Sequence, residues 1–512
     1  MPWPTQSGIY RLPDEIFSYI FLSAIRDYDH PSEAAFFPLA ISHTCSRWRK
    51  VSLSTASLWT SIKLCLPLSS EQLEYLDTWL ERSKAHPLDM LLDFRDEDWA
   101  WEEENHILTL DWTHLIFSAI LPHAKRWRHI ELFTDTWAPI HTFLDLTRDL
   151  ADLPFLKSVA LSRCNAYFAR KGECFKPIEL REPIPLFGGA QQLPSLRELS
   201  LVGVHVDWQR SSSSLVNLSE LEFKFHAYDV MPSLDRFREI LAACPELERL
   251  SIVGWGPRID EEVSPTGVNG IISTGHSVTR MITLPKLTRF CFGFVDVEYA
   301  MKLLSFFILP FLSELELEDV AGTVDPMGPS DSSPLLNFFV EAPTTTTPHH
   351  HHPFGSLERI NLSDVDSELL SALGPYKFFS EPAAAAATAT AVASDDTGNG
   401  VAAVPPATSR RPSFVSSLST TLAPCPQLVD VICRRVDTSI LSSVISARSK
   451  AGSGVKTVQL ELAPDVDVDD GGGGGDDDGD FDSDDGKSAI SGLSEEDRCS
   501  FVESGVELIV TT

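Results

Sequence analysis

A short acidic segment holds the side chains best placed to perform catalysis. Trp99 and Trp101 lie among six carboxylates. These carboxylates are Asp96, Glu97, Asp98, Glu102, Glu103 and Glu104. Glycoside hydrolases place two carboxylates around the bond that they cleave. A solvated acidic loop with half-buried tryptophans explains the same residues more simply, and we favour that interpretation over a hydrolase.

Four consecutive histidines, His349 to His352, could offer imidazole nitrogens to a transition metal. A metal site needs ligands that converge and partners that orient them, whereas these residues are adjacent and flanked by threonine and proline. The sequence also contains no phosphate-binding, dinucleotide-binding, zinc-hydrolase or nucleophile-elbow motif. We therefore expect a protein that is not an enzyme and needs no metal or cofactor.

The charge of the chain limits its partners. The 512 residues carry a formal net charge of -32, and 43% of them are hydrophobic. Eleven aspartates and no lysine or arginine lie between residues 465 and 485. Because acidic surfaces repel phosphate groups, we expect no nucleic acid and no membrane surface as partner.

Cysteine usage and the amino terminus indicate the compartment. Nine cysteines are scattered without a C-x-x-C pair, which is typical of a reducing environment. Residues 1–10 have neither a basic nor an apolar region of the kind found in signal peptides. These features predict a cytoplasmic or nuclear protein.

The elements that position the functional side chains begin near residue 12. Pro13 and two carboxylates open a helix that we expect over residues 13–24. Leu12, Ile16 and Ile20 share one face of it, and Phe21 flanks that face. This apolar surface is wider than one short helix can bury.

Two more helices are expected before residue 65. Ile41, Cys45 and Trp48 are spaced along one face of the second, which ends in basic residues. Residues 54–57 supply capping side chains for the third, which contains Trp59. Three short helices form a small core, so docking on a partner would stabilise the unit.

The amino-acid sequence of this segment resembles that of the F-box-like domain of fungal proteins. L-P-D-E-I-F begins at Leu12, C-S-R-W-R at Cys45 and L-S-T-A-S-L-W-T-S-I at Leu53, and the resemblance covers residues 11–64. It implies docking on the Skp adaptor of cullin-RING ubiquitin ligases. The residues it implies for adaptor binding, or for the core that supports it, are Leu12, Pro13, Ile16, Ile20, Phe21, Trp48, Val51 and Trp59.

An apolar pattern, L-x-x-L-x-L, recurs ten times after this segment. The copies begin at Trp127, Leu156, Leu196, Leu218, Leu247, Leu287, Leu312, Leu357, Leu428 and Val455. The fourth and sixth positions alternate with polar residues, as in a strand with one buried face. Helical patterns such as residues 233–243, with Ser233 as cap, lie between copies. The pattern resembles the leucine-rich repeat, although its spacing is irregular.

Together these patterns predict an α/β protein: a three-helix F-box-like unit followed by an irregular leucine-rich repeat solenoid with parallel strands, outer helices and disordered inserts. Residues 65–126, with a strand at 88–94, would form a linker and the cap of a solenoid that spans 127–464. The expected inserts are residues 328–353 and 381–412, followed by an acidic disordered segment at 465–486 and a tail at 487–512.

The function that the resemblance implies is that of a substrate-recognition subunit in an SCF-type ubiquitin ligase. The helical unit would bind the Skp adaptor, and through it a cullin scaffold, while the repeats hold a protein target of unknown identity. Two alternatives stay open. The helices could merely cap a scaffold protein that lacks any link to ubiquitin, or the acidic tryptophan-rich segment could act as a hydrolase.

Overall fold

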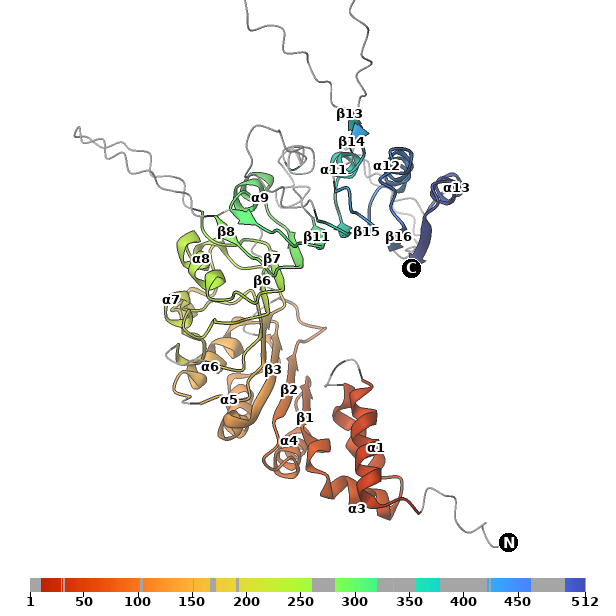
Figure 1. The fold of residues 1–512 in the computed structure, drawn as a ribbon. Coiled ribbons are helices and arrows are strands. Elements are labelled where there is room, and N and C mark those ends of the chain that lie inside the picture. Colours follow the sequence, from red (N-terminus) through yellow and green to blue (C-terminus); the bar gives the residue numbers. More distant parts are fainter. Residues whose placement is uncertain are drawn as a thin grey trace, which may run out of the picture.

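Parallel strands joined by helices dominate the protein. The computed structural model describes residues 11–28, 30, 33–101, 105–150, 152–165, 172–189, 193–259, 281–319, 335, 356–377, 421–422, 425–461 and 493–511. Within these residues one sheet has 13 strands, and each pairs in parallel with the next strand along its order (Figure 1). The expected α/β class is therefore confirmed.

The strands of this sheet follow each other in chain order. They are β1 (Ser61–Cys65), β2 (Leu88–Phe94), β3 (Trp127–Thr134), β4 (Ser158–Arg163), β5 (Glu198–Val202), β6 (Glu220–Lys224), β7 (Arg249–Val253), β9 (Arg289–Gly293), β11 (Glu314–Glu318), β12 (Arg359–Ser363), β15 (Asp430–Arg434), β16 (Thr457–Glu461) and β17 (Glu507–Thr511). Two short pairs stand apart: β8 (Ile282–Thr283) with β10 (Phe307–Ile308), and β13 (Tyr376–Lys377) with β14 (Thr421–Leu422).

Helices lie along the outer side of the curved sheet, and a separate group precedes β1 (Figure 1). The preceding group is α1 (Asp14–Arg26), α2 (Phe37–Ser42) and α3 (Ser46–Ser54). The outer helices include α4 (Ser70–Arg82), α5 (Leu110–Ile120), α6 (Trp137–Thr147), α7 (Trp208–Ser211), α8 (Leu234–Ala242), α9 (Val297–Leu304), α11 (Ser367–Ala372), α12 (Thr438–Lys450) and α13 (Glu495–Glu503). Among the described residues no helix has the length and apolar character that crossing a membrane requires.

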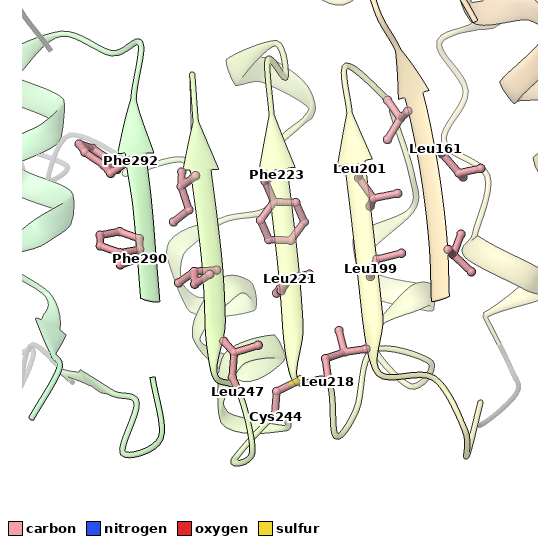
Figure 2. Packing of buried hydrophobic residues seen from close by; sticks show 14 of the residues in the cluster. Leu161, Leu199, Leu201, Leu218, Leu221, Phe223, Cys244, Leu247, Phe290 and Phe292 are labelled. Atoms are coloured by element: carbon pink, nitrogen blue, oxygen red, sulfur yellow. The ribbon is translucent and has the colours of Figure 1, made fainter. Parts of the chain in front are cut away.

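The repeated apolar positions form the core between sheet and helices. All ten predicted copies coincide with strands, from β3 to β16, and the side chains at their fourth and sixth positions are buried. Leu199 and Leu201 on β5 lie beside Leu221 and Phe223 on β6, while Leu218 closes the turn below (Figure 2). Because side chains alternate along a strand, the apolar row of each strand faces the helices, and the polar row lies on the opposite face of the sheet.

The sheet is longer than the ten copies indicated. β1 and β2 extend it toward the amino terminus, so strands already occur within residues 11–64 and 65–126. Residues 487–512, expected as a tail, contain α13 and β17, and β17 pairs with β16. If the sheet ended at β16, one edge of that strand would have unpaired backbone groups. Pairing with β17 satisfies them.

The helices before β1 also differ from the expectation. The second helical pattern is interrupted, because Cys45 is extended and its sulfur accepts a hydrogen bond from the Trp48 amide as the N-cap of α3. The third is a single 3-10 turn, Ala56–Trp59, and Ile62 already belongs to β1. The expected inserts at 328–353, 381–412 and 465–486 lie outside the described residues, apart from Leu335.

Candidate functional site

The first helix presents apolar side chains to solvent. Pro13 is extended and leads into α1, and Asp14 and Glu15 complement the positive helix end. Ile16 and Ile20 are each 43% exposed, and Tyr19 is 66% exposed. Positions i, i+3 and i+4 lie on one side of a helix, so these three side chains form a single stripe, which we call the α1 stripe.

The start of α1 is held in place by Arg47 on α3. Its guanidinium pairs with the Asp14 carboxylate at 2.9 Å and also donates to the Leu12 carbonyl. The same group lies 4.8 Å from the centre of the Phe17 ring. Leu12 is half-buried and Pro13 is exposed. Both residues directly precede α1, at the end of the helix nearest Ile16. Arg47 therefore fixes the direction in which the stripe faces.

The other residues implied for adaptor binding are packed inside. Phe21, Val51 and Trp59 are buried, and Trp48 is half-buried against the Phe21 ring, 5.0 Å between centroids. Phe21, Val51 and Trp59 form the supporting core rather than a contact surface. Of the eight implied residues, the structure leaves Pro13, Ile16 and Ile20 exposed, with Leu12 and Trp48 half-buried at the margin.

Trp59 joins the helices before β1 to the rest of the protein. Its indole N–H donates to the Ser52 carbonyl at 2.8 Å, and its ring meets Trp79 on α4 edge-on. The Arg82 guanidinium covers the Trp59 ring at 4.4 Å. The apolar core is continuous from Phe17 through this junction to the sheet. The helical unit is therefore attached to the sheet and not suspended on a linker.

Reasoning from the sequence missed several exposed apolar residues in this unit. Tyr19 lies in the α1 stripe, three residues after Ile16, and its helical spacing could have identified it. Phe36, Leu39 and Leu53 are also exposed, at 52%, 37% and 40%. Their exposure depends on how the short helices pack against one another, for which the sequence carries no local signal.

The polar face of the sheet, opposite the helices, forms a second candidate surface. Strands β4 to β11 line a hollow of about 440 Å³. Its charged residues are five glutamates and three cations, namely Glu198, Glu220, Glu222, Glu316 and Glu318 with Lys224, Arg249 and Arg289. They occupy the positions that alternate with the buried ones, so parallel pairing brings side chains from distant repeats together.

Ion pairs neutralise much of this hollow. Arg249 pairs with Glu220, Lys224 with Glu222 at 2.6 Å, and Arg289 with Glu316 at 3.2 Å. Each cation thus has a glutamate partner on its own or an adjacent strand. Within the described part of the chain, Glu198 and Glu318 form no ion pair. The hollow consequently carries a surplus of negative charge.

One part of the hollow has a geometry that could in principle hold a metal ion. The ligand atoms of Cys291, Glu316 and Glu318 all lie within 4.8 Å of one another. The Glu316 carboxylate already accepts from Asn361 at 2.9 Å and from Arg289. Burial and the two glutamates raise the pKa of the Cys291 thiol. Because the Glu316 carboxylate is already engaged and the cationic Arg289 lies beside it, the cluster is a poor metal site.

The acidic tryptophan segment forms a local network. Trp99 and Trp101 stack at 5.7 Å between centroids, and Trp101 is 63% exposed rather than half-buried. The buried Asp135 carboxylate accepts from the Asp96 amide at 2.6 Å and lies 3.0 Å from His106 Nε2. Glu102, Glu103 and Glu104 lie outside the described residues, as do His349 to His352.

Comparison with known proteins adds no family. Neither the protein-family models nor the curated proteins contain a match to this chain.

Proposed function

We propose that the protein is the substrate-recognition subunit of an SCF-type cullin-RING ubiquitin ligase, in the cytoplasm or nucleus. Residues 11–64 form an F-box-like unit that binds the Skp adaptor, and the strands form a leucine-rich repeat solenoid that holds a protein target. The observation that carries the proposal is the α1 stripe. Ile16, Tyr19 and Ile20 are exposed at the position where the family resemblance implies adaptor contact.

Burying the α1 stripe provides binding energy without refolding the unit. Each exposed isoleucine or tyrosine that becomes buried contributes on the order of 1 kcal/mol or more, at about 25 cal/mol per Å² of apolar area. The aromatic core of Phe17, Phe21 and Trp48 already supports the helix from behind. A rigid apolar helix face of this kind suits a partner with an apolar groove or helix.

The order of the strands supports the second half of the proposal. Parallel strands that pair strictly in chain order, each followed by an outer helix or turn, are typical of solenoids. Such folds expose one side chain row per repeat on a long surface. That surface is suited to hold a protein, while the chemistry of ubiquitin transfer belongs to the partners.

A second candidate is supported by the junction at Trp59. Because Trp59 and Trp79 join the helices to the sheet in one core, the helices could serve only as the amino-terminal cap of a scaffold solenoid. A cap needs its buried face but has no use for an exposed apolar stripe. The α1 stripe therefore favours the ligase subunit over the scaffold.

Adaptor binding tests the proposal directly. Purified Skp adaptor is titrated against the full chain and against the double variant Ile16→Asp, Ile20→Asp, with binding measured by calorimetry. We expect a loss of at least a hundredfold in the variant. The matched control is Ile178→Asp, at an apolar residue that is 70% exposed far along the chain, and it should bind like the parent.

Circular dichroism must show the same fold in all three proteins. Absence of adaptor binding by the parent chain would contradict the proposal and leave the scaffold interpretation. Equal binding by the parent and the double variant would contradict the assignment of the α1 stripe.

A further inference from the structure

We propose that the polar face of β9, β11 and β12, opposite the helices, binds a lysine or arginine side chain of the protein held by the sheet. This inference rests on the proposed role of the sheet as a protein-binding surface, but not on adaptor binding. The site consists of Cys291, Glu316, Glu318 and Asn361, which we call the acceptor cluster. It supplies oxygen acceptors that the described residues leave incompletely used.

Strand register assembles the acceptor cluster from three separate repeats. Cys291 on β9 is paired with Glu316 on β11, and Glu316 with Asn361 on β12. Glu318 lies two residues beyond Glu316 and therefore on the same face. The Cys291 sulfur is 4.0 Å from a Glu318 carboxylate oxygen.

Asn361 provides the observation that points to a missing donor. Its side-chain N–H donates to Glu316 at 2.9 Å, which sets the orientation of the amide. Its carbonyl oxygen, Oδ1, is buried and has no hydrogen-bond partner, and the residue as a whole is only 8% exposed. An unpaired buried acceptor is costly, and this one belongs to a side chain that contacts the Glu316 carboxylate.

Glu318 also lacks an ion pair among the described residues. The nearby cations Lys224 and Arg434 pair with Glu222 at 2.6 Å and Glu461 at 2.7 Å. Burial raises the pKa of Glu318 above its ordinary value; Lys224 and Arg434 oppose this shift only in part, and repulsion from Glu316 adds to it. A cation placed beside Glu318 would relieve both effects.

The occupant is a side-chain cation rather than a metal ion. The Glu316 carboxylate is already engaged by Asn361 and Arg289, which leaves only Cys291 and Glu318 as free ligands, fewer than a transition metal usually takes from a protein. An ammonium or guanidinium group instead needs acceptors, which the cluster provides.

Glu198 offers a second point of attachment for the same partner. It is the other glutamate of the hollow without an ion pair, and it lies on β5, four strand spacings from β11. At about 4.8 Å per spacing the two strands are roughly 19 Å apart, a span that about six residues of an extended chain would cover. The preferred partner is therefore a segment with two basic residues about that far apart.

Peptide selection tests the inference. Random 12-residue peptides displayed on phage are selected on the full chain at 150 mM salt in the presence of a chelator. The most enriched peptide is then synthesised and titrated by fluorescence anisotropy. We expect enrichment of paired lysines or arginines, and at least tenfold weaker binding to the variants Glu318→Gln and Glu198→Gln.

A matched control removes two charges elsewhere. Glu298 on α9 and Glu368 on α11 are exposed on outer helices, so Glu298→Gln, Glu368→Gln tests whether net charge alone attracts the peptide. This control variant should bind the selected peptide as tightly as the parent chain does. Equal weakening in the control, or no enrichment of basic residues, overturns the inference.

Two further measurements separate the possible failures. If Zn²⁺ displaces the peptide and Cys291→Ser abolishes that displacement, the site is a metal site and the inference is overturned. Adaptor binding is measured on the same Glu318→Gln protein and should be unchanged. Selection of basic peptides by a chain that fails to bind adaptor would support this inference while contradicting the ligase proposal.

Discussion

The indole rings of Trp59 and Trp79 meet edge to face, with centroids 4.8 Å apart and an interplanar angle of 77°. Trp59 ends the last helical turn before β1, and Trp79 lies on α4, the first helix after it. Both rings are buried. This contact packs the helices that carry the α1 stripe against α4, the first helix after β1.

Replacing the buried Trp59 should destabilise the protein far more than replacing the exposed Tyr19. Because the ring is fully buried, Trp59→Ala should lower the free energy of unfolding by about 3–5 kcal/mol. Tyr19→Ala, at an exposed ring of the same unit, should change it by less than about 0.5 kcal/mol. Urea denaturation followed by circular dichroism measures both. A small effect at Trp59 would mean that the helices are not part of the continuous core.

Arg448 on α12 should prove essential for the carboxyl-terminal part of the sheet. Its buried guanidinium donates to the carbonyls of Leu373 at 2.8 Å and Cys425 at 2.9 Å. Arg448→Met would leave both carbonyls without this donor and should cost about 2–4 kcal/mol. Lys450→Met, at an exposed position on the same helix, is the control and should be nearly neutral. Thermal unfolding distinguishes the two.

The start of α8 depends on one hydroxyl. Ser233 accepts a hydrogen bond from the Arg236 amide as N-cap, as the sequence predicted. Ser233→Ala should destabilise the protein by about 1 kcal/mol, and Ser233→Asp should restore the loss. Hydrogen exchange at the first turn of α8 reports the effect locally. Faster exchange in both variants would contradict a capping role.

His226 should make stability depend on pH. The ring is fully buried, and burial lowers its pKa from 6.5 to about 4 even though two carbonyls face its nitrogens. Below pH 6.5 the His226 imidazole takes up a proton in the unfolded chain but stays neutral in the folded chain. The free energy of unfolding therefore falls as the pH decreases toward 4. The loss over this window is on the order of 2–3 kcal/mol.

Denaturation at several pH values tests this behaviour. His226→Gln removes the titrating group and should show a smaller decline between pH 6.5 and 4. A remaining decline is expected from His205, whose pKa burial also lowers to about 4. Identical pH profiles for the parent and the variant would show that His226 does not titrate in this range.

Local patterns in the sequence were sufficient to predict most of the strands. The pairs Leu199 with Leu201 and Leu221 with Phe223 alternate with polar residues, and this pattern alone indicates a strand with one buried face. The cap at Ser233 was predicted in the same way, whereas the capping side chains expected at residues 54–57 form no cap hydrogen bond with the 3-10 turn Ala56–Trp59. These features depend on residues within a few positions of one another.

The tertiary structure decided which of these side chains stay exposed and which meet. Ile16 and Phe21 both belong to the apolar surface of α1, but only packing against Trp48 buries Phe21 and leaves Ile16 outside. Cys291, Glu316 and Asn361 are brought together by strand register, although chain segments of irregular length separate them. The repeated pattern gives each of them the fifth position of its copy, but only the parallel pairing of β9, β11 and β12 places those positions side by side.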